Sequence, residues 1–173
     1  MDTGDPMNKA VLVLALAGFT GMAAGPLIAA PSKADKTFAT SAASGGLAEV
    51  ELGQLAEQKA ASAQVKEFAR TMVSDHTQAK QDLEQIAQQE NLTLPKRPGK
   101  KEREESQRLH KLSGAAFDKQ YMAHMVQDHR KDVSEFQREA TSGKDPALKS
   151  YAQKYLPVLQ KHLQMAEATS SHK

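Results

Sequence analysis

The feature that most constrains this chain is the regular spacing of its apolar residues between positions 63 and 90. Apolar residues and one histidine recur there at alternating intervals of four and three positions. This spacing places the side chains on one face of an α-helix and is typical of helices packed in an antiparallel bundle. The residues on this face are Val65, Ala69, Met72, His76, Ala79, Leu83 and Ile86. The pattern therefore predicts a helix over residues 63–90 with one buried face.

Two later segments carry the same spacing, and an earlier one carries a less regular form of it. Residues 115–140 place Phe117, Tyr121, Met125, His129, Val133 and Phe136 on one face. Residues 146–168 place Leu148, Ala152, Tyr155, Leu159, His162 and Ala166 on one face. A first helix is expected over residues 35–61, where Gly45 and Gly46 are expected to let a neighbouring helix approach closely.

The connection between the second and third long helices is unusually long. Pro95, Pro98 and Gly99 end the helix that precedes it, and the charged residues 100–112 predict a short, exposed helix. Such a connection can carry the chain back along the length of a bundle. No segment alternates as a strand would. The fold class predicted is therefore all-α: a ferritin-like four-helix bundle with a long crossover that contains a short extra helix.

The start of the chain has the features of an export signal. Lys9 precedes an uncharged, largely apolar run over residues 10–30, and acidic residues precede Met7, which fits better as the true start. We predict a signal segment over residues 1–34, a helical domain over residues 35–173, and an exported protein that is periplasmic or associated with the cell envelope. Retention of the apolar run as a membrane anchor is the alternative, since it is long enough to span a bilayer.

Composition narrows the function classes further. The chain has no cysteine, which excludes disulfides, thiolate metal sites and cysteine nucleophiles. Its net charge of +2 indicates no polyanionic partner. The basic residues within 96–103 are followed by Glu104 and Glu105, which indicates a solvated connector and not a nucleic-acid site. The partners expected are unidentified proteins of the cell envelope, with no nucleic acid, and with membrane contact only through a retained signal segment.

One pentapeptide occurs twice. Met72-Val73-Ser74-Asp75-His76 returns as Met125-Val126-Gln127-Asp128-His129. In both copies the histidine lies on the apolar face. The aspartate before it points about 100° away, toward the flank, where a lysine or arginine would pair with it. A titratable ring on a buried face needs a polar partner, so these histidines are where any chemistry is expected.

Four polar residues on the inward faces form a candidate metal site. They are Glu49, His76, His129 and His162, one from each long helix. Imidazole and carboxylate suit a copper, zinc, iron or manganese ion. Methionines close to the histidines in the sequence would favour copper, namely Met72, Met125 and Met165. The alternative is that each histidine is a core residue hydrogen-bonded to an acid such as Glu49 or to a tyrosine.

The di-iron signature of ferritin-like proteins is absent. That signature is Glu-x-x-His, whereas Val73 and Val126 stand three residues before His76 and His129. Ferroxidase or oxygenase chemistry at a carboxylate-bridged di-iron centre is therefore not expected. No Ser/His/Asp arrangement, phosphate-binding loop or nucleotide fingerprint is present either. We predict no catalytic residues and assign no cofactor-binding residues, and the cofactor stays open apart from the transition-metal ion considered above. A non-enzymatic role is expected ahead of an enzymatic one.

Several motifs together resemble a known family. They are the segment around Glu49, both copies of Met-Val-x-Asp-His, Phe117-Asp118-x-x-Tyr121, and Leu156-Pro157 followed by His162. Over about residues 36–168 the chain resembles the domain-of-unknown-function family 4142. The resemblance implies an exported bacterial protein, often labelled an outer membrane protein, with a ferritin-like helical fold. It implies no established activity.

Two functions are favoured by the sequence, ahead of a hydrolase or oxygenase that would use a metal at the same residues but for which no catalytic base is recognisable. The first is a non-enzymatic exported bundle with an envelope or stress-related role that depends on protein contacts. The second is a periplasmic bundle that binds a transition metal through the four inward residues and buffers or senses that metal.

Overall fold

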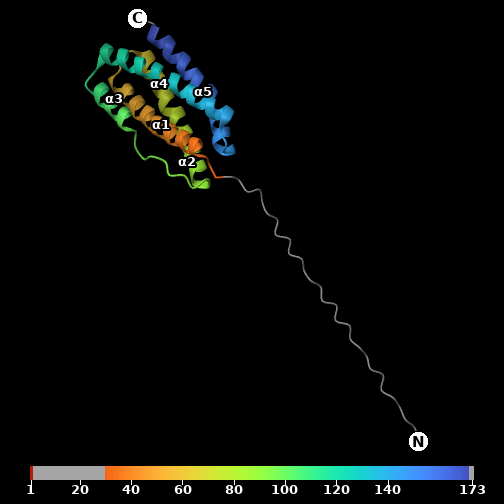
Figure 1. Ribbon diagram of the computed structural model, residues 1–173. Coiled ribbons are helices and arrows are strands. Elements are labelled where there is room, and N and C mark those ends of the chain that lie inside the picture. Colours follow the sequence, from red (N-terminus) through yellow and green to blue (C-terminus); the bar gives the residue numbers. More distant parts are fainter. Residues whose placement is uncertain (2–29, 172–173) are drawn as a thin grey trace.

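The computed structural model describes Met1 and residues 30–171, and its five elements are all α-helices (Figure 1). They are α1 (Lys33–Lys59), α2 (Ala63–Gln89), α3 (Lys100–His110), α4 (Gly114–Ser142) and α5 (Pro146–Ser171). No strand occurs among these residues, so the all-α prediction is confirmed. None of the described helices is long and apolar enough to cross a membrane. Most of the predicted signal segment lies outside the described residues and stays a prediction.

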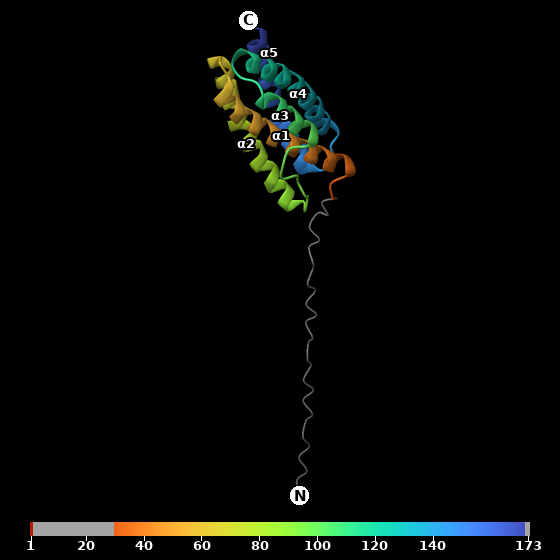
Figure 2. The same cartoon turned by 90° about the vertical axis from the view of Figure 1, so that its left-hand side faces the viewer.

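Two helical hairpins build the bundle (Figures 1 and 2). The first hairpin pairs α1 with α2 and the second pairs α4 with α5, while α1 also contacts α4 and α2 contacts α5. The connection from α2 to α4 includes α3, which lies against α1 and α4. This connection returns the chain along the bundle, so α2 and α4 run in the same direction. The predicted ferritin-like four-helix bundle with a helix in its crossover is confirmed.

Aspartate side chains hold several helix ends. At the start of α1, Ser32 N–H donates to Asp35 Oδ2 (2.7 Å) and Asp35 N–H donates to Ser32 Oγ (3.3 Å), which is a capping box. Asp35 Oδ1 accepts a further hydrogen bond from Lys144 N–H (2.9 Å) and so ties α1 to the turn between α4 and α5. Asp145 caps α5, as its position before a proline predicts. Helix α1 begins at Lys33, two residues before the expected start of the domain.

A polar layer divides the core into two apolar clusters. One cluster includes Leu52, Phe68, Met72, Tyr121, Met125 and Ala166. The other includes Ala43, Leu83, Phe136, Tyr151 and Leu159. On each long helix, a residue of the predicted metal site lies between the two clusters: Glu49 on α1, His76 on α2, His129 on α4 and His162 on α5. The same four-three spacing that buries the apolar residues therefore buries these four polar ones.

Helices α1 and α2 approach closely at Gly53. A Cβ atom added there would lie 2.8 Å from Val73 Cγ2 and 3.1 Å from the Ala69 carbonyl oxygen. By contrast, a Cβ at Gly45 or Gly46 would meet no described atom within 4 Å. The expectation that this glycine pair allows a close helix approach is therefore wrong, because both residues face open space.

The substitution Gly53→Ala should lower the free energy of unfolding by about 1–3 kcal/mol, since the added methyl group overpacks a helix contact. The matched change Gly45→Ala should raise it by about 0.5–1 kcal/mol, because alanine is the better helix former and has room. Urea unfolding followed by circular dichroism measures both. Equal stabilisation by the two changes would contradict the close contact at Gly53.

Two carboxyl groups lie together where α1 meets the end of α4. Burial raises the pKa of Glu139 to about 7, and the neighbouring Asp35 carboxylate adds to the rise. Burial acts to raise the pKa of Asp35, but its hydrogen bonds from Ser32 and Lys144 outweigh that effect and lower it to about 2. Glu139 is 5% exposed, and its Oε1 has no hydrogen-bond partner among the described residues. Near neutral pH, the contact is therefore most stable when Glu139 carries a proton.

A raised pKa in the folded state stabilises the protein at low pH, and the benefit is lost as pH rises through about 4.5 to 7. Glu139→Gln, which cannot ionise, should therefore be more stable than the wild type at pH 8, by on the order of 1 kcal/mol. At pH 4 the difference should nearly vanish. Thermal unfolding across this range measures it, with Glu104→Gln on the exposed face of α3 as the control. A constant difference at every pH would contradict the assignment.

Candidate metal centre

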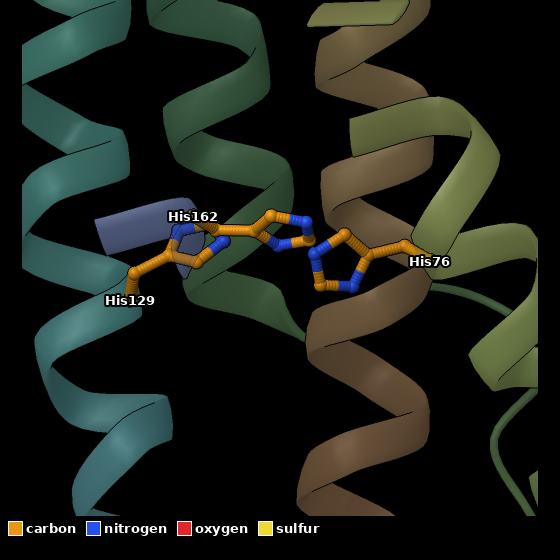
Figure 3. A group of neighbouring side chains, drawn as sticks. All are labelled: His76, His129 and His162. Atoms are coloured by element: carbon orange, nitrogen blue, oxygen red, sulfur yellow. The ribbon is translucent and has the colours of Figure 1, made fainter. Parts of the chain in front are cut away.

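The four predicted ligands meet in the polar layer. Glu49, His76, His129 and His162 are 1%, 6%, 0% and 1% exposed, respectively. The three rings point toward one another from α2, α4 and α5 (Figure 3), and one ring nitrogen of each lies within 4.8 Å of the others. The bundle thus brings together residues that are far apart in the sequence.

The spacing of the rings matches what a shared metal ion would need. The ring centres of His76 and His129 are 5.7 Å apart, and His162 lies 5.3 Å from each of them. A metal ion about 2.1 Å from one nitrogen of each ring, with tetrahedral angles, would hold the ring centres roughly 5 Å apart. A metal ion would therefore require little movement of the helices.

A backbone contact sets the tautomer of His129. Its Nδ1 lies 3.0 Å from the carbonyl oxygen of Met125, one turn earlier on α4. A carbonyl oxygen only accepts, so Nδ1 donates and Nε2 of the neutral ring carries the lone pair. That Nε2 lies 3.4 Å from Glu49 Oε1. Two ligands bound tetrahedrally to one metal ion at about 2.1 Å would be separated by about the same distance.

A carboxylate sets the tautomer of His162. Its Nε2 lies 2.9 Å from Asp75 Oδ2, so Nε2–H donates and Nδ1 carries the lone pair. Carboxylates hold metal-binding histidines in this way in many proteins. The prediction that Asp75 pairs with a lysine or arginine on the flank is wrong. Although Asp75 is 40% exposed, α5 packs against α2 closely enough for His162 to reach it.

Glu49 connects two of the rings. Its Oε2 lies 2.9 Å from His76 Nδ1, and its Oε1 faces His129. The alternative reading of the histidines as acid-paired core residues therefore applies to one nitrogen of His76 and one of His162. In His129 the corresponding nitrogen contacts a backbone carbonyl instead.

Each of the four residues also keeps one buried polar atom without a hydrogen-bond partner among the described residues. These atoms are Glu49 Oε1, His76 Nε2, His129 Nε2 and His162 Nδ1. The second polar atom of each side chain is held by the contacts above. The Met125 carbonyl and Asp75 thus orient His129 and His162, while Glu49 and His76 orient each other. One polar atom of each of the four side chains stays unpaired.

Burial and charge determine the protonation of the layer. Burial lowers the pKa of His129 below its usual range and lowers that of His162 to about 4, and the charge of His76 adds to both effects. Burial also acts to lower the pKa of His76, but the Glu49 carboxylate outweighs it and raises that pKa. Burial would raise the pKa of Glu49, yet the charge of His76 and its hydrogen bond hold that pKa below its usual range. These shifts favour an ion pair between Glu49 and His76, and they favour neutral imidazoles with a free lone pair at His129 and His162.

Two more carboxylates lie next to Glu49. Asp128 and Asp132 of α4 have oxygens within 4.8 Å of a Glu49 oxygen and of each other. Burial raises the pKa of Asp128 to about 6 and that of Asp132 well above its usual range, and the charge of Glu49 adds to both. The prediction that Asp128 pairs with a basic residue on the flank is wrong, because its carboxylate faces these two acids.

A small cavity adjoins the layer. Its volume is about 40 Å³, and its polar lining includes Glu49, His76, Asp132 and His162. Most of the remaining lining is apolar and comes from α1, α2 and α5, with Leu94 and Pro95 of the crossover. The cavity is large enough for one or a few water molecules.

The methionines belong to the apolar core. Met72 and Met125 are fully buried in the cluster that includes Phe68 and Tyr121, and Met165 packs against that cluster. This position accounts for them as core side chains.

Most of the chain matches one known family. The profile of DUF4142, described as a domain of unknown function, matches residues 22–169. The chain belongs to this family. Its resemblance to family 4142 in the motifs around the histidines is thereby confirmed, and membership in DUF4142 brings no assigned activity with it. No curated protein matches the chain.

A solved structure shares the fold. The crystal structure of a DUF305 fragment from Deinococcus radiodurans superimposes with a TM-score of 0.73 at 10% sequence identity, covering 84% of this chain and 100% of that one. At this identity the similarity supports the helical fold alone.

Sequence reasoning found the four central residues but missed three acids around them. The angle along a single helix predicts Asp75 and Asp128 on the flank, and this angle does not show which neighbouring helix they face. Asp132 was not singled out, although its spacing of four from Asp128 places both on one face of α4.

The two tautomers give a direct test of this geometry. In the metal-free protein near neutral pH, His129 should carry its hydrogen on Nδ1 and His162 on Nε2. Long-range ¹H–¹⁵N correlation spectra distinguish the two forms. Asp75→Asn should change the His162 pattern and leave that of His129 unchanged. The same tautomer in both rings would contradict the contacts described.

Proposed function

We propose that this protein binds a transition-metal ion in the polar layer of its bundle and buffers or senses that metal outside the cytoplasm. The ligands would be Glu49, His76, His129 and His162. The proposal is carried by the unpaired, buried polar atom that each of these side chains directs into the layer. Buried polar atoms seldom stay unpaired in proteins. Four of them in one layer argue for a ligand that they share.

A purely structural role explains only one of the two ring nitrogens of each histidine. Asp75, Glu49 and the Met125 carbonyl satisfy one nitrogen in each ring. The other nitrogens would remain desolvated and unpaired, at a cost of about 1–3 kcal/mol each. An apolar residue of similar size would avoid this cost, so packing alone gives no reason for three histidines here.

The donor set narrows the choice of metal. Three imidazole nitrogens and one carboxylate oxygen suit divalent first-row metals, and zinc often binds such ligands in tetrahedral geometry. By the usual order of affinities, Cu²⁺ and Zn²⁺ should bind more tightly than Fe²⁺ or Mn²⁺. The methionines give no added reason for copper, since the apolar core accounts for them.

The closed arrangement favours holding a metal over catalysis. Four protein ligands fill a tetrahedral shell, whereas catalytic zinc sites keep one position for water or substrate. The uncharged run over residues 10–30 supports export, and we place the protein in the periplasm or at the cell envelope. An envelope or stress-related role would follow if occupancy of the site changed its contacts with envelope proteins.

Metal content and metal-dependent stability test the proposal. Untagged protein purified after export should contain about one metal ion per chain, and Zn²⁺ or Cu²⁺ added to the stripped protein should raise its melting temperature. At a free metal concentration of one hundred times Kd, the added stability should be about 2.7 kcal/mol. The His76→Ala/His129→Ala double variant should lose at least 100-fold in affinity. The control is His110→Ala, since His110 is exposed at the end of α3.

Two results would overturn the proposal. One is wild-type protein that is metal-free and gains no stability from zinc, copper, iron or manganese. The other is a double variant that stays folded and binds metal as the wild type does. Circular dichroism of each variant separates loss of the site from loss of the fold.

A further inference from the structure

We propose that Glu49, Asp128 and Asp132 form a second divalent-cation site that shares Glu49 with the histidine site. The layer would then hold two metal ions side by side. The inference rests on the proposed function, because Glu49 belongs to both sites. It adds a second ion of different chemistry, held by oxygen atoms alone.

The packing of α1 against α4 brings the three carboxylates close together. Asp128 and Asp132 are one turn apart and therefore lie on the same face of α4. Helix α1 packs against α4 and carries Glu49 into this face. One oxygen from each of the three groups lies within 4.8 Å of the other two. A single cation between them could therefore contact all three.

Little positive charge compensates these acids within the protein. Lys131 Nζ lies 3.8 Å from Asp132 Oδ1, but it also lies 3.7 Å from Glu135 Oε1, and its side chain is 52% exposed. His76 contacts Glu49 from the side of α2. Among residues 30–171, no side chain forms an ion pair with Asp128, although the charges of His124 and Lys131 act on its carboxyl group.

The buried Glu49 carboxylate supports a ligand shared by the two sites. Glu49 is 1% exposed, and its Oε1 has no hydrogen-bond partner among the described residues. A carboxylate oxygen has two lone pairs, so one oxygen can accept two cations. One Glu49 oxygen lies within 4.8 Å of the aspartate oxygens, and the unpaired Oε1 lies 3.4 Å from His129 Nε2, so the Glu49 carboxylate could contact a cation in each site. This pair of sites differs from the di-iron centre of ferritin-like proteins. Its additional carboxylates are Asp128 and Asp132, and the Glu-x-x-His pattern is absent.

The carboxylate site should prefer a harder cation than the histidine site. Three carboxylate oxygens suit Mn²⁺, Mg²⁺ or Ca²⁺, which usually keep some water ligands. The cavity reaches both Asp132 and Glu49 and can hold such water. The histidine site should take Zn²⁺ first, and the carboxylate site should then take Mn²⁺.

Sequential titration tests the second site. Full-length exported protein, stripped of metal, receives one equivalent of Zn²⁺ and then Mn²⁺, with free Mn²⁺ followed by its electron paramagnetic resonance signal. The wild type should bind one Zn²⁺ and then one Mn²⁺ per chain. The Asp128→Asn/Asp132→Asn variant should keep its Zn²⁺ and bind Mn²⁺ at least tenfold more weakly. The control Glu104→Gln/Glu167→Gln removes two exposed carboxylates and should bind both ions as the wild type does.

The outcomes separate this inference from the proposed function. If the wild type binds Zn²⁺ but no Mn²⁺, or if the aspartate variant binds Mn²⁺ unchanged, the second site is wrong and the proposed function stands. If Mn²⁺ binds and Zn²⁺ does not, the histidine site is wrong and the carboxylate site stands. As a second variant, Glu49→Gln should weaken the binding of both ions. Weaker binding of Zn²⁺ alone would show that Glu49 is not shared.

Discussion

The interaction on which the centre of this structure depends is the burial of the Glu49 carboxylate among three imidazole rings. A buried charge is costly unless it is paired, and here His76 is charged in response while His129 and His162 stay neutral. The four side chains come from four helices, so their contacts constrain the positions of these helices along the bundle axis. The apolar clusters on either side lower the local polarity around the layer and so strengthen its polar contacts.

The chain topology makes this layer possible. Two hairpins joined by the α3-containing crossover set α2 and α4 in the same direction, so the two copies of the repeated motif bring their histidines to one level. The repeat therefore places two equivalent imidazole rings, those of His76 and His129, next to Glu49. His162, which lies outside the repeat, completes the group from α5 and is oriented by Asp75 of the first copy.

Much of the fold and part of the site were predictable, and the errors share a cause. Helical spacing is a local property, so the long helices and the inward residues Glu49, His76, His129 and His162 could be read from the order of residues. The angle along one helix also put Asp75 and Asp128 on the flank, and this is correct for an isolated helix. It failed in the bundle because a flank position of one helix can face its neighbour. The position of the close approach of α1 and α2, at Gly53 and not at Gly45 or Gly46, also depends on how the two helices pack.

The sequence by itself determined the helices, the crossover, the family and the four residues that point inward. Only the tertiary structure decided which atom of each of those residues is paired and which is left free. That decision depends on contacts between α2 and α5 and between α1 and α4, over distances of a few ångströms that no spacing along the chain encodes. The pairing of Asp75 with His162 and the grouping of Glu49 with Asp128 and Asp132 arise in this way, and they give the layer its chemistry.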